Sequence, residues 1–309
     1  MEAARRHHGA TSRSGVEMQK HAKGGQGHLS LRLTTTLALV LVVLGAAPHA
    51  QPGGSAISGL HATLDAILDL YVRDGLVYYR TLRGERARLD RYAGALNVSP
   101  ATYEGWSRDE QAAFWVNAYN TFVLRTVINN YPIRGRSTQY PPNSIRQVPG
   151  AFERLTHRAA GRSVTLDQIE KTILPAFGDP RLYLALGRGA VGSGRLRSEA
   201  YTGAGLAEQL EAVAEDCVDR SECSLLDKDA GELSITPIFS WHEQEFIKAY
   251  SEPGEQAYPG RSALELAILR LLEPNFLPTE RAFLRRNTFR VKFVAFDWRL
   301  NDLTDGGPR

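Results

Sequence analysis

The sequence predicts an α+β fold, a mainly helical single domain with a small, largely antiparallel sheet. Apolar residues recur at helical spacing in several long segments, whereas runs typical of strands are short and scattered. The regular alternation of strand and helix that a parallel sheet needs does not occur. The chain has 309 residues, which is enough to bury the core of one large domain.

Three helices are expected in the first half of the chain. Apolar residues at helical spacing predict helices over residues 57–72 and 84–96. The strongest helix signal begins at Ser107, which forms a capping box with Glu110, and continues to the Tyr131-Pro132 pair. This segment is apolar on nearly all sides, so we expect a central, buried helix.

The middle of the chain combines loops with short elements. Residues 133–150 are rich in Pro, Gly, Ser and Asn and predict a long loop. Two short strands are expected around Ala160-Gly161, followed by a helix over 166–174 and a strand over 182–186. The remaining expected elements are helices at 205–216, 238–250, 262–272 and from Thr279, a hairpin around 229–231, and a last strand at 289–296.

The first fifty residues differ from the rest and are typical of a secretory signal. They carry six basic and two acidic residues, and an apolar run at 37–47 is followed by small residues. The run is shorter than the roughly 20 residues that span a bilayer, so no stable membrane anchor is expected after cleavage. We expect a signal peptide over 1–50, with a possible true start at Met18, a tether over 51–56, one domain over 57–303 and a tail over 304–309. A buried N-terminal helix is the alternative, and a periplasmic or secreted location follows from export.

The predicted mature chain is nearly neutral and has few metal-binding residues. Removing the leader reduces the 37 basic and 34 acidic residues to 31 and 32, which argues against a nucleic-acid partner. The remaining histidines, His61, His157 and His242, lack the spacing of a metal site, so we expect no metal and no cofactor. Cys217 and Cys223 are expected to form a disulfide in an exported protein.

A glycine-rich segment, residues 187–192, matches the pattern G-x-G-x-x-G. In dinucleotide-binding proteins this pattern lies between a strand and a helix whose N-terminus faces the phosphates. Here more glycines follow and no helix is predicted before about residue 204, so a nucleotide-binding enzyme is a remote alternative. Ser193 lies between two glycines but lacks the G-x-S-x-G pattern of a nucleophile elbow.

Five motifs resemble one protein family. They are AFWVNAYNTFVL (113–124), TLDQIE (165–170), DPRLYLAL (179–186), SITPIFSWHEQEF (234–246) and VKFVAFDWRLND (291–302). In this order they resemble the domain of unknown function 547 family, whose biochemical activity is not established. The resemblance implies an Asn-Cys pair and a Ser-Cys-Pro run in the loop at 187–194, but this chain has Gly187-Arg188 and Gly192-Ser193-Gly194 at those places. It also implies a histidine where this chain has Tyr183, and in many relatives a tyrosine where it has His242.

Several polar residues remain candidates for a site. Asn117 and Asn120 lie in the apolar helix and need partners, which are either neighbouring backbone or a ligand. Arg181 is expected to pair with Glu170, or to clamp a carboxylate. Arg188 joins this group as a candidate binding residue.

Three residues are candidates for catalysis: Ser193, His242 as a base near neutral pH, and Asp297, which could equally cap the exit of the last strand. Three tryptophans, Trp115, Trp241 and Trp298, are expected to be core aromatics. Because the thiols are missing, we expect an exported protein with a non-catalytic binding or structural role and an unknown small molecule or protein as partner. A hydrolase or transferase using the three candidate catalytic residues is the alternative.

Overall fold

The computed structural model describes residues 53–250 and 258–303. The predicted signal peptide and tail therefore lie outside the described residues. The first helix, α1 (Gly53–Tyr71), begins inside the segment that was expected to be a tether. Within the described residues, no helix combines the length and the apolar character needed to cross a bilayer.

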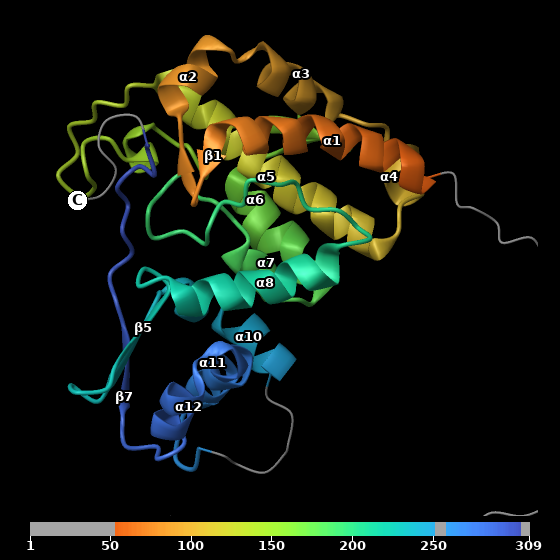
Figure 1. Ribbon diagram of the computed structural model, residues 1–309. Helices are drawn as coiled ribbons and strands as arrows, with labels where there is room; N and C mark the ends of the chain where they lie inside the picture. Colours follow the sequence, from red (N-terminus) through yellow and green to blue (C-terminus); the bar gives the residue numbers. More distant parts are fainter. Residues whose placement is uncertain (1–52, 251–257, 304–309) are drawn as a thin grey trace, which may run out of the picture. The chain divides into compact units, whose positions relative to one another are not determined.

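The long helix α5 (Arg108–Asn130) forms the centre of the helical part, as its apolar composition predicts. Ser107 and Glu110 form the expected capping box at its start. Helices α1, α2 (Tyr79–Gly84) and α3 (Ala87–Ala95) pack against it, as Figure 1 shows. The short helix α4 (Pro100–Glu104) precedes it in the chain and is capped by Ser99.

The segment after α5 carries the elements that hold the site. The loop over 133–150 is ordered by one 3₁₀ turn, η1 (Ile145–Gln147), and the expected hairpin pairs β3 (His157–Ala159) with β4 (Arg162–Val164). Both turn residues of the hairpin, Ala160 and Gly161, have positive φ, as tight hairpin turns require. The next helical segment comprises α6 (Leu166–Gln168), a π-turn η2 (Ile169–Ile173) and a 3₁₀ turn η3 (Leu174–Phe177).

One predicted strand is wrong. The apolar run at 182–186 belongs instead to a short helix, α7 (Arg181–Leu184), and to the buried chain that follows it. A continuous apolar run is compatible with either a buried strand or a buried helix, because periodicity alone does not separate the two. Since α7 is a helix, the glycine-rich segment does not follow a strand.

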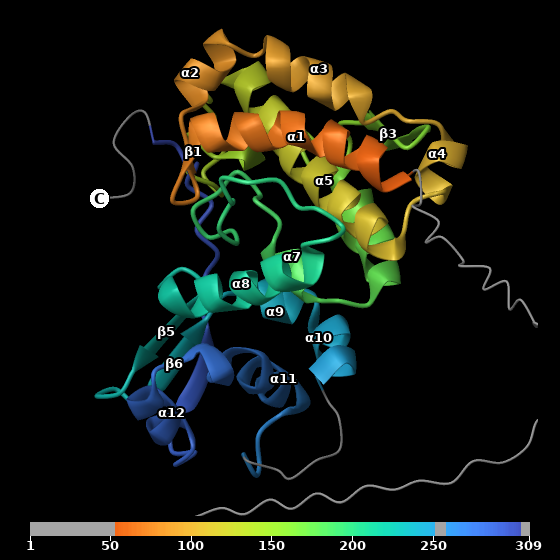
Figure 2. The same cartoon turned by 45° about the vertical axis from the view of Figure 1, so that its right-hand side comes forward.

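The C-terminal part combines helices with a three-stranded sheet. Helix α8 (Leu206–Asp219) lies between the helices around α5 and this part in both views (Figures 1 and 2). Strands β5 (Ser224–Asp227) and β6 (Glu232–Ile235) form the expected antiparallel hairpin, while β7 (Arg290–Phe293) pairs with β6 in parallel. A further pair, β1 (Val72–Arg73) and β2 (Leu76–Val77), is antiparallel. The remaining helices are α9 (Ile238–Trp241), α10 (Glu243–Tyr250), α11 (Ala263–Leu272), η4 (Glu273–Asn275) and α12 (Pro278–Leu284).

The described residues thus form a mainly helical α+β structure with small sheets, as predicted. The helix expected over 238–250 is divided in two at His242, whose backbone leaves the helical conformation. This break turns the His242 side chain out of the regular helical path at the point where a pocket forms.

Candidate functional site

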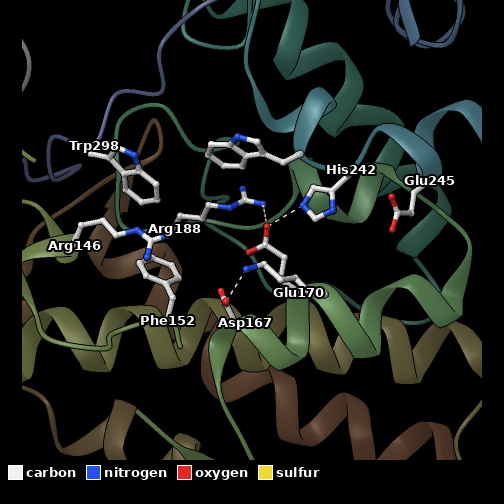
Figure 3. Close-up of a pocket in the computed structure, with 10 residues that line it drawn as sticks. Arg146, Phe152, Asp167, Glu170, Arg188, His242, Glu245 and Trp298 are labelled. Carbon is white, nitrogen blue, oxygen red and sulfur yellow. Dashed lines mark hydrogen bonds and ion pairs between the residues drawn. The ribbon is translucent and has the colours of Figure 1, made fainter. Parts of the chain in front are cut away.

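A pocket of about 450 Å³ lies among residues from five separate parts of the chain (Figure 3). Its volume falls in the range of about 300–1,000 Å³ that is usual for small-molecule sites. Its lining combines charged and aromatic side chains: Arg146, Phe152, Asp167, Glu170, Lys171, Arg188, Trp241, His242, Glu245 and Trp298.

The Glu170 carboxylate forms the floor of the pocket and is bound from three sides. Its Oε1 accepts hydrogen bonds from Arg188 at 2.6 Å and from Nε2 of His242 at 2.9 Å. Its Oε2 accepts one from the Tyr119 hydroxyl at 3.0 Å. Burial alone would raise the pKa of Glu170, but the charge of Arg188 and the bonds from Arg188 and His242 hold that pKa well below its ordinary value. The floor therefore carries an ionised carboxylate at neutral pH.

Local backbone structure fixes the position of Glu170. Thr165 caps the start of α6, and a capping box with Gln168 completes this cap. Glu170 then lies in the π-turn η2, a rare helical form that is frequent at functional sites. The TLDQIE motif therefore encodes a start signal for the helix and places the carboxylate at its first irregular turn.

The Arg188 guanidinium is almost fully buried, with a side chain that is 2% exposed. Besides the ion pair with Glu170, it donates to the backbone carbonyls of Tyr183 and Leu186. These bonds use three of the five N–H groups that a guanidinium carries. Burial would lower the pKa of Arg188, but the Glu170 charge outweighs it and raises the pKa above its usual value. Arg188 is thus a fixed cation at the pocket floor.

The glycine-rich loop around Arg188 is folded onto the protein itself. Asn120 accepts from the Gly187 N–H and donates to the Ala185 carbonyl, and the Ser193 Oγ accepts from the Arg188 N–H. At Gly194, an added Cβ would lie 1.5 Å from a backbone oxygen of α7, so only glycine fits.

Other N–H groups of this loop are also bonded within the chain. The amides of Val191 and Gly192 donate to the carbonyls of Arg299 and Asp297. In a dinucleotide fingerprint such amides face a pyrophosphate and a helix starts at once. Here these amides donate to carbonyls of the protein itself, and the next helix, α8, begins only at Leu206. The glycines of 187–194 serve close packing of backbone in this loop.

The imidazole of His242 is held between Glu170 and an aromatic ring. Its ring stacks on that of Tyr183, with centroids 3.6 Å apart and an angle of 5° between the planes. The family resemblance implies the reverse arrangement, a histidine at the Tyr183 position and a tyrosine at the His242 position. The two residue types therefore form one stacked pair in this chain, with the imidazole on the side that bonds to Glu170.

Aromatic side chains form part of the pocket lining, and Trp298 is drawn above Arg188 in Figure 3. The rings of Trp241 and Trp298 are nearly parallel, at 18°, with centroids 6.3 Å apart. The Arg146 guanidinium lies over both Phe152 and Trp298, at 4.3 and 4.7 Å from the ring centroids. Trp241 is 44% exposed, so its prediction as a core aromatic is wrong, whereas Trp115 is fully buried as expected.

Charged side chains line the opposite wall and the rim. Lys171 pairs with Asp167 at 2.6 Å, and Arg146 pairs with Glu153. Glu245 lies at the other end of the pocket from Arg146 (Figure 3) and forms no ion pair with the described residues. The pocket thus presents both signs of charge around an apolar wall.

Several residues predicted from the sequence lie away from the pocket. Arg181 pairs with Asp179 at 2.7 Å and not with Glu170, because the start of α7 places the two neighbours in one turn. Asn117 donates to the Tyr201 carbonyl and accepts from the Tyr201 amide, which braces the chain before α8.

The three candidate catalytic residues are not assembled in one pocket. Ser193 is buried as part of the glycine-rich loop, and Asp297 pairs with Arg299 after β7. Only His242 lines the pocket. Among the lining residues there is no Ser, Thr, Cys or Tyr hydroxyl or thiol that could act as a nucleophile.

Two further expectations concern cysteines and metals. Cys217 and Cys223 form the predicted disulfide, which ties the last turn of α8 to the residue before β5. In the part of the chain that the structure describes, no group of three or more His, Cys, Asp and Glu residues is arranged to hold a metal ion.

Several residues of the pocket were not predicted. Arg146 lies in a segment that the sequence predicts only as a loop, and Asp167, Lys171 and Glu245 look like ordinary charged residues of exposed helix faces. One signal was available, because the DQIEK run places two acids and a base within five residues of a strong helix start. Charge in such a run is common on solvated helices, so it does not by itself indicate a pocket.

Comparisons with known proteins connect part of this chain with one family by similarity. Searches among curated proteins and among solved structures gave no significant match. A family model described as "Protein of unknown function, DUF547" matches residues 103–218, which include α5, the π-turn with Glu170 and the loop with Arg188. Residues 103–218 of the chain are therefore similar to the DUF547 family of proteins of unknown function.

Proposed function

We propose that this chain is an exported binding protein whose pocket holds a small ligand without chemical turnover by a thiol. One observation carries the proposal. The ionisable residues Glu170, Arg188 and His242 come from different parts of the sequence, yet they meet at the floor of one pocket of small-molecule size. Burying three ionisable groups together is costly unless a function or a complete network compensates for it.

The hydrogen bonds of Glu170 and the presence of Arg188 at the pocket floor favour a binding role over catalysis. The Glu170 carboxylate has bonds from Arg188, His242 and Tyr119, so its lone pairs are largely engaged. The Arg188 guanidinium takes the place where the family resemblance implies a cysteine, and a guanidinium does not act as a nucleophile. The aromatic wall supplies the apolar area on which small-molecule affinity depends.

Export is supported by the basic and apolar leader in the sequence and by the disulfide. Expression of the full chain in a bacterial host tests this part of the proposal. We expect the protein in the periplasmic or extracellular fraction, with a new N-terminus near residue 51 in the mass spectrum. A chain that stays in the cytoplasm with residues 1–50 attached contradicts export.

A panel of small molecules tests the binding part, with neutral sugars, dipeptides, aromatic carboxylates, amines and nucleotides in separate wells. A ligand at about 100 times its Kd stabilises the folded state by about 2.7 kcal/mol, which is a clear rise in Tm. We expect such a rise for at least one class with the natural chain and none with Trp298→Ala. No rise for any class contradicts the proposal.

A second candidate function is a hydrolase that uses His242 as a general base. The observation in its favour is the bond between Nε2 of His242 and Glu170, because a carboxylate that binds one ring nitrogen orients the other for proton transfer. His242→Gln distinguishes the two functions. Loss of ester or amide hydrolysis with unchanged ligand binding favours the hydrolase, and the absence of hydrolysis in the natural chain favours the binding protein.

A further inference from the structure

We propose that the ligand of this pocket is a neutral carbohydrate, seated with the C–H face of a sugar ring on Trp241 and Trp298. This inference rests on the proposed binding function and names its ligand class. Three features carry it: the geometry of the aromatic wall, the pairing of every cation of the pocket with a carboxylate, and the Glu245 carboxylate, which has no cationic partner among the described residues.

The aromatic wall requires a ligand with a flat apolar face. Trp241 and Trp298 lie nearly parallel, and Phe296 packs on both, with ring centroids 5.0 and 4.4 Å away. Trp241 is 44% exposed, so part of its ring is open to a ligand. A pyranose ring of the glucose type presents such a face, because its axial C–H groups lie on the two faces of the ring and its equatorial hydroxyls point outward from the rim.

The charges of the pocket disfavour an anionic ligand. Each of the three cations already has a carboxylate partner: Arg146 with Glu153, Lys171 with Asp167, and Arg188 with Glu170. An anionic ligand would have to compete with these ion pairs and would meet the ionised Glu170 at the floor. A phosphate or carboxylate compound therefore fits this pocket poorly.

Hydroxyl groups match the hydrogen-bonding capacity that remains. Glu245 and Asp167 offer carboxylate oxygens that accept from hydroxyls, and such charge-assisted bonds are the strong ones. Lys171 and the two N–H groups of Arg188 that its protein bonds leave over are donors. A sugar hydroxyl both donates and accepts, so one ring can use both kinds of group around the same pocket.

Titration calorimetry and tryptophan fluorescence with defined probes test this inference. The neutral probes are cellobiose, maltose and the β-1,4-linked disaccharide of N-acetylglucosamine. The charged probes are benzoate, which is an anion, and phenylethylamine, which is a cation. We expect saturable binding of at least one disaccharide with a change in tryptophan emission, and no binding of the charged probes.

Variants show whether binding occurs in this pocket. Trp241→Ala should weaken sugar binding about tenfold or more, since it removes one side of the aromatic wall. Glu245→Gln should weaken it about tenfold, because it replaces a charged acceptor by a neutral amide. The matched control is Phe293→Ala, which removes a similarly exposed aromatic (39%) outside the pocket and should leave affinity unchanged.

The outcomes separate the ligand class from the binding function. Sugar binding that is lost in Trp241→Ala and kept in Phe293→Ala supports both. Binding of a charged probe alone, with the same dependence on Trp241, overturns the carbohydrate and leaves the binding function standing. Binding of no probe in any class overturns both, as does sugar binding that Trp241→Ala and Glu245→Gln leave unchanged.

Discussion

Replacing Arg188 by methionine should destabilise the fold strongly, because the change strands a buried carboxylate. Arg188→Met removes the 2.6 Å ion pair to Glu170 and the two bonds to the carbonyls of Tyr183 and Leu186, while keeping most of the side-chain volume. Removing one partner of a buried ion pair costs about 3–5 kcal/mol. Since many domains have about 5–15 kcal/mol of stability, this loss is large but measurable.

A double-mutant cycle identifies the origin of that loss. In Arg188→Met combined with Glu170→Gln, no charge is left without a partner, and we expect the double variant to recover at least about 2 kcal/mol of the single variant's loss. The assay is urea unfolding followed by far-UV circular dichroism, with the free energy of unfolding extrapolated to water. Glu170→Gln alone, which leaves Arg188 uncompensated, is the reciprocal control.

The pH dependence gives an independent check. The folded-state pKa of Glu170 lies below its unfolded value, so the natural chain gains stability above the unfolded pKa and loses it as the pH falls toward the folded one. Without Arg188, burial dominates and raises the folded-state pKa of Glu170. Protonation of Glu170 as the pH falls then removes the buried unpaired charge and reduces the destabilisation of the variant. The difference in stability between Arg188→Met and the natural chain should therefore shrink from pH 7 to pH 4. The reasoning is refuted if Arg188→Met costs less than about 1 kcal/mol at pH 7, or if the double variant recovers nothing.

The remaining predictions concern stability elsewhere in the fold. Burial lowers the pKa of His61 to about 4 from 6.5, so between these pH values the unfolded state binds the proton more readily than the folded state. The contribution of His61 to the free energy of unfolding should therefore fall by about 3 kcal/mol as the pH drops from 6.5 to 4. A urea midpoint that stays constant across this range contradicts the prediction. Gly194→Ala should lower the free energy of unfolding by about 3 kcal/mol or more, because the new Cβ meets the Leu184 carbonyl. Gly94→Ala in α3 is the matched control and should raise it by about 0.5–1 kcal/mol, because nothing lies near its new Cβ. Equal effects of the two variants on Tm would be inconsistent with this packing. Replacing both cysteines by serine should lower stability by about 2 kcal/mol, and the oxidised natural chain should show no free thiol to a thiol reagent under denaturing conditions.

Much of the fold follows from local signals in the sequence. The capping box at Ser107 and the apolar segment behind it specify α5 together with its burial, and the Ala160-Gly161 turn specifies a hairpin. The strand predicted at 182–186 is wrong because five apolar residues in a row carry no period. The break at His242 has no comparable local signal, since the segment around it reads as one amphipathic helix.

The site was only partly predictable, because its residues are brought together by tertiary packing. Glu170, Arg188 and His242 were candidates from their sequence context, but their mutual contact spans 72 positions between Glu170 and His242. The sequence predicts an ion pair between Arg181 and Glu170, but Arg181 pairs instead with Asp179, which is two residues before it in the chain. Trp241 is exposed and Trp115 is buried, and the residue type alone does not predict this difference.

The boundary of the family match divides the pocket between two stretches of chain. Residues 103–218 supply the charged floor and one rim, whereas Trp241, His242, Glu245 and Trp298 come from beyond that boundary. Within this chain, the similarity to the family therefore covers the ion pair of Glu170 and Arg188 at the floor, whereas both tryptophans of the pocket lie outside it. The choice of ligand in this pocket is therefore expected to depend mainly on the C-terminal stretch, which supplies Trp241, Glu245 and Trp298.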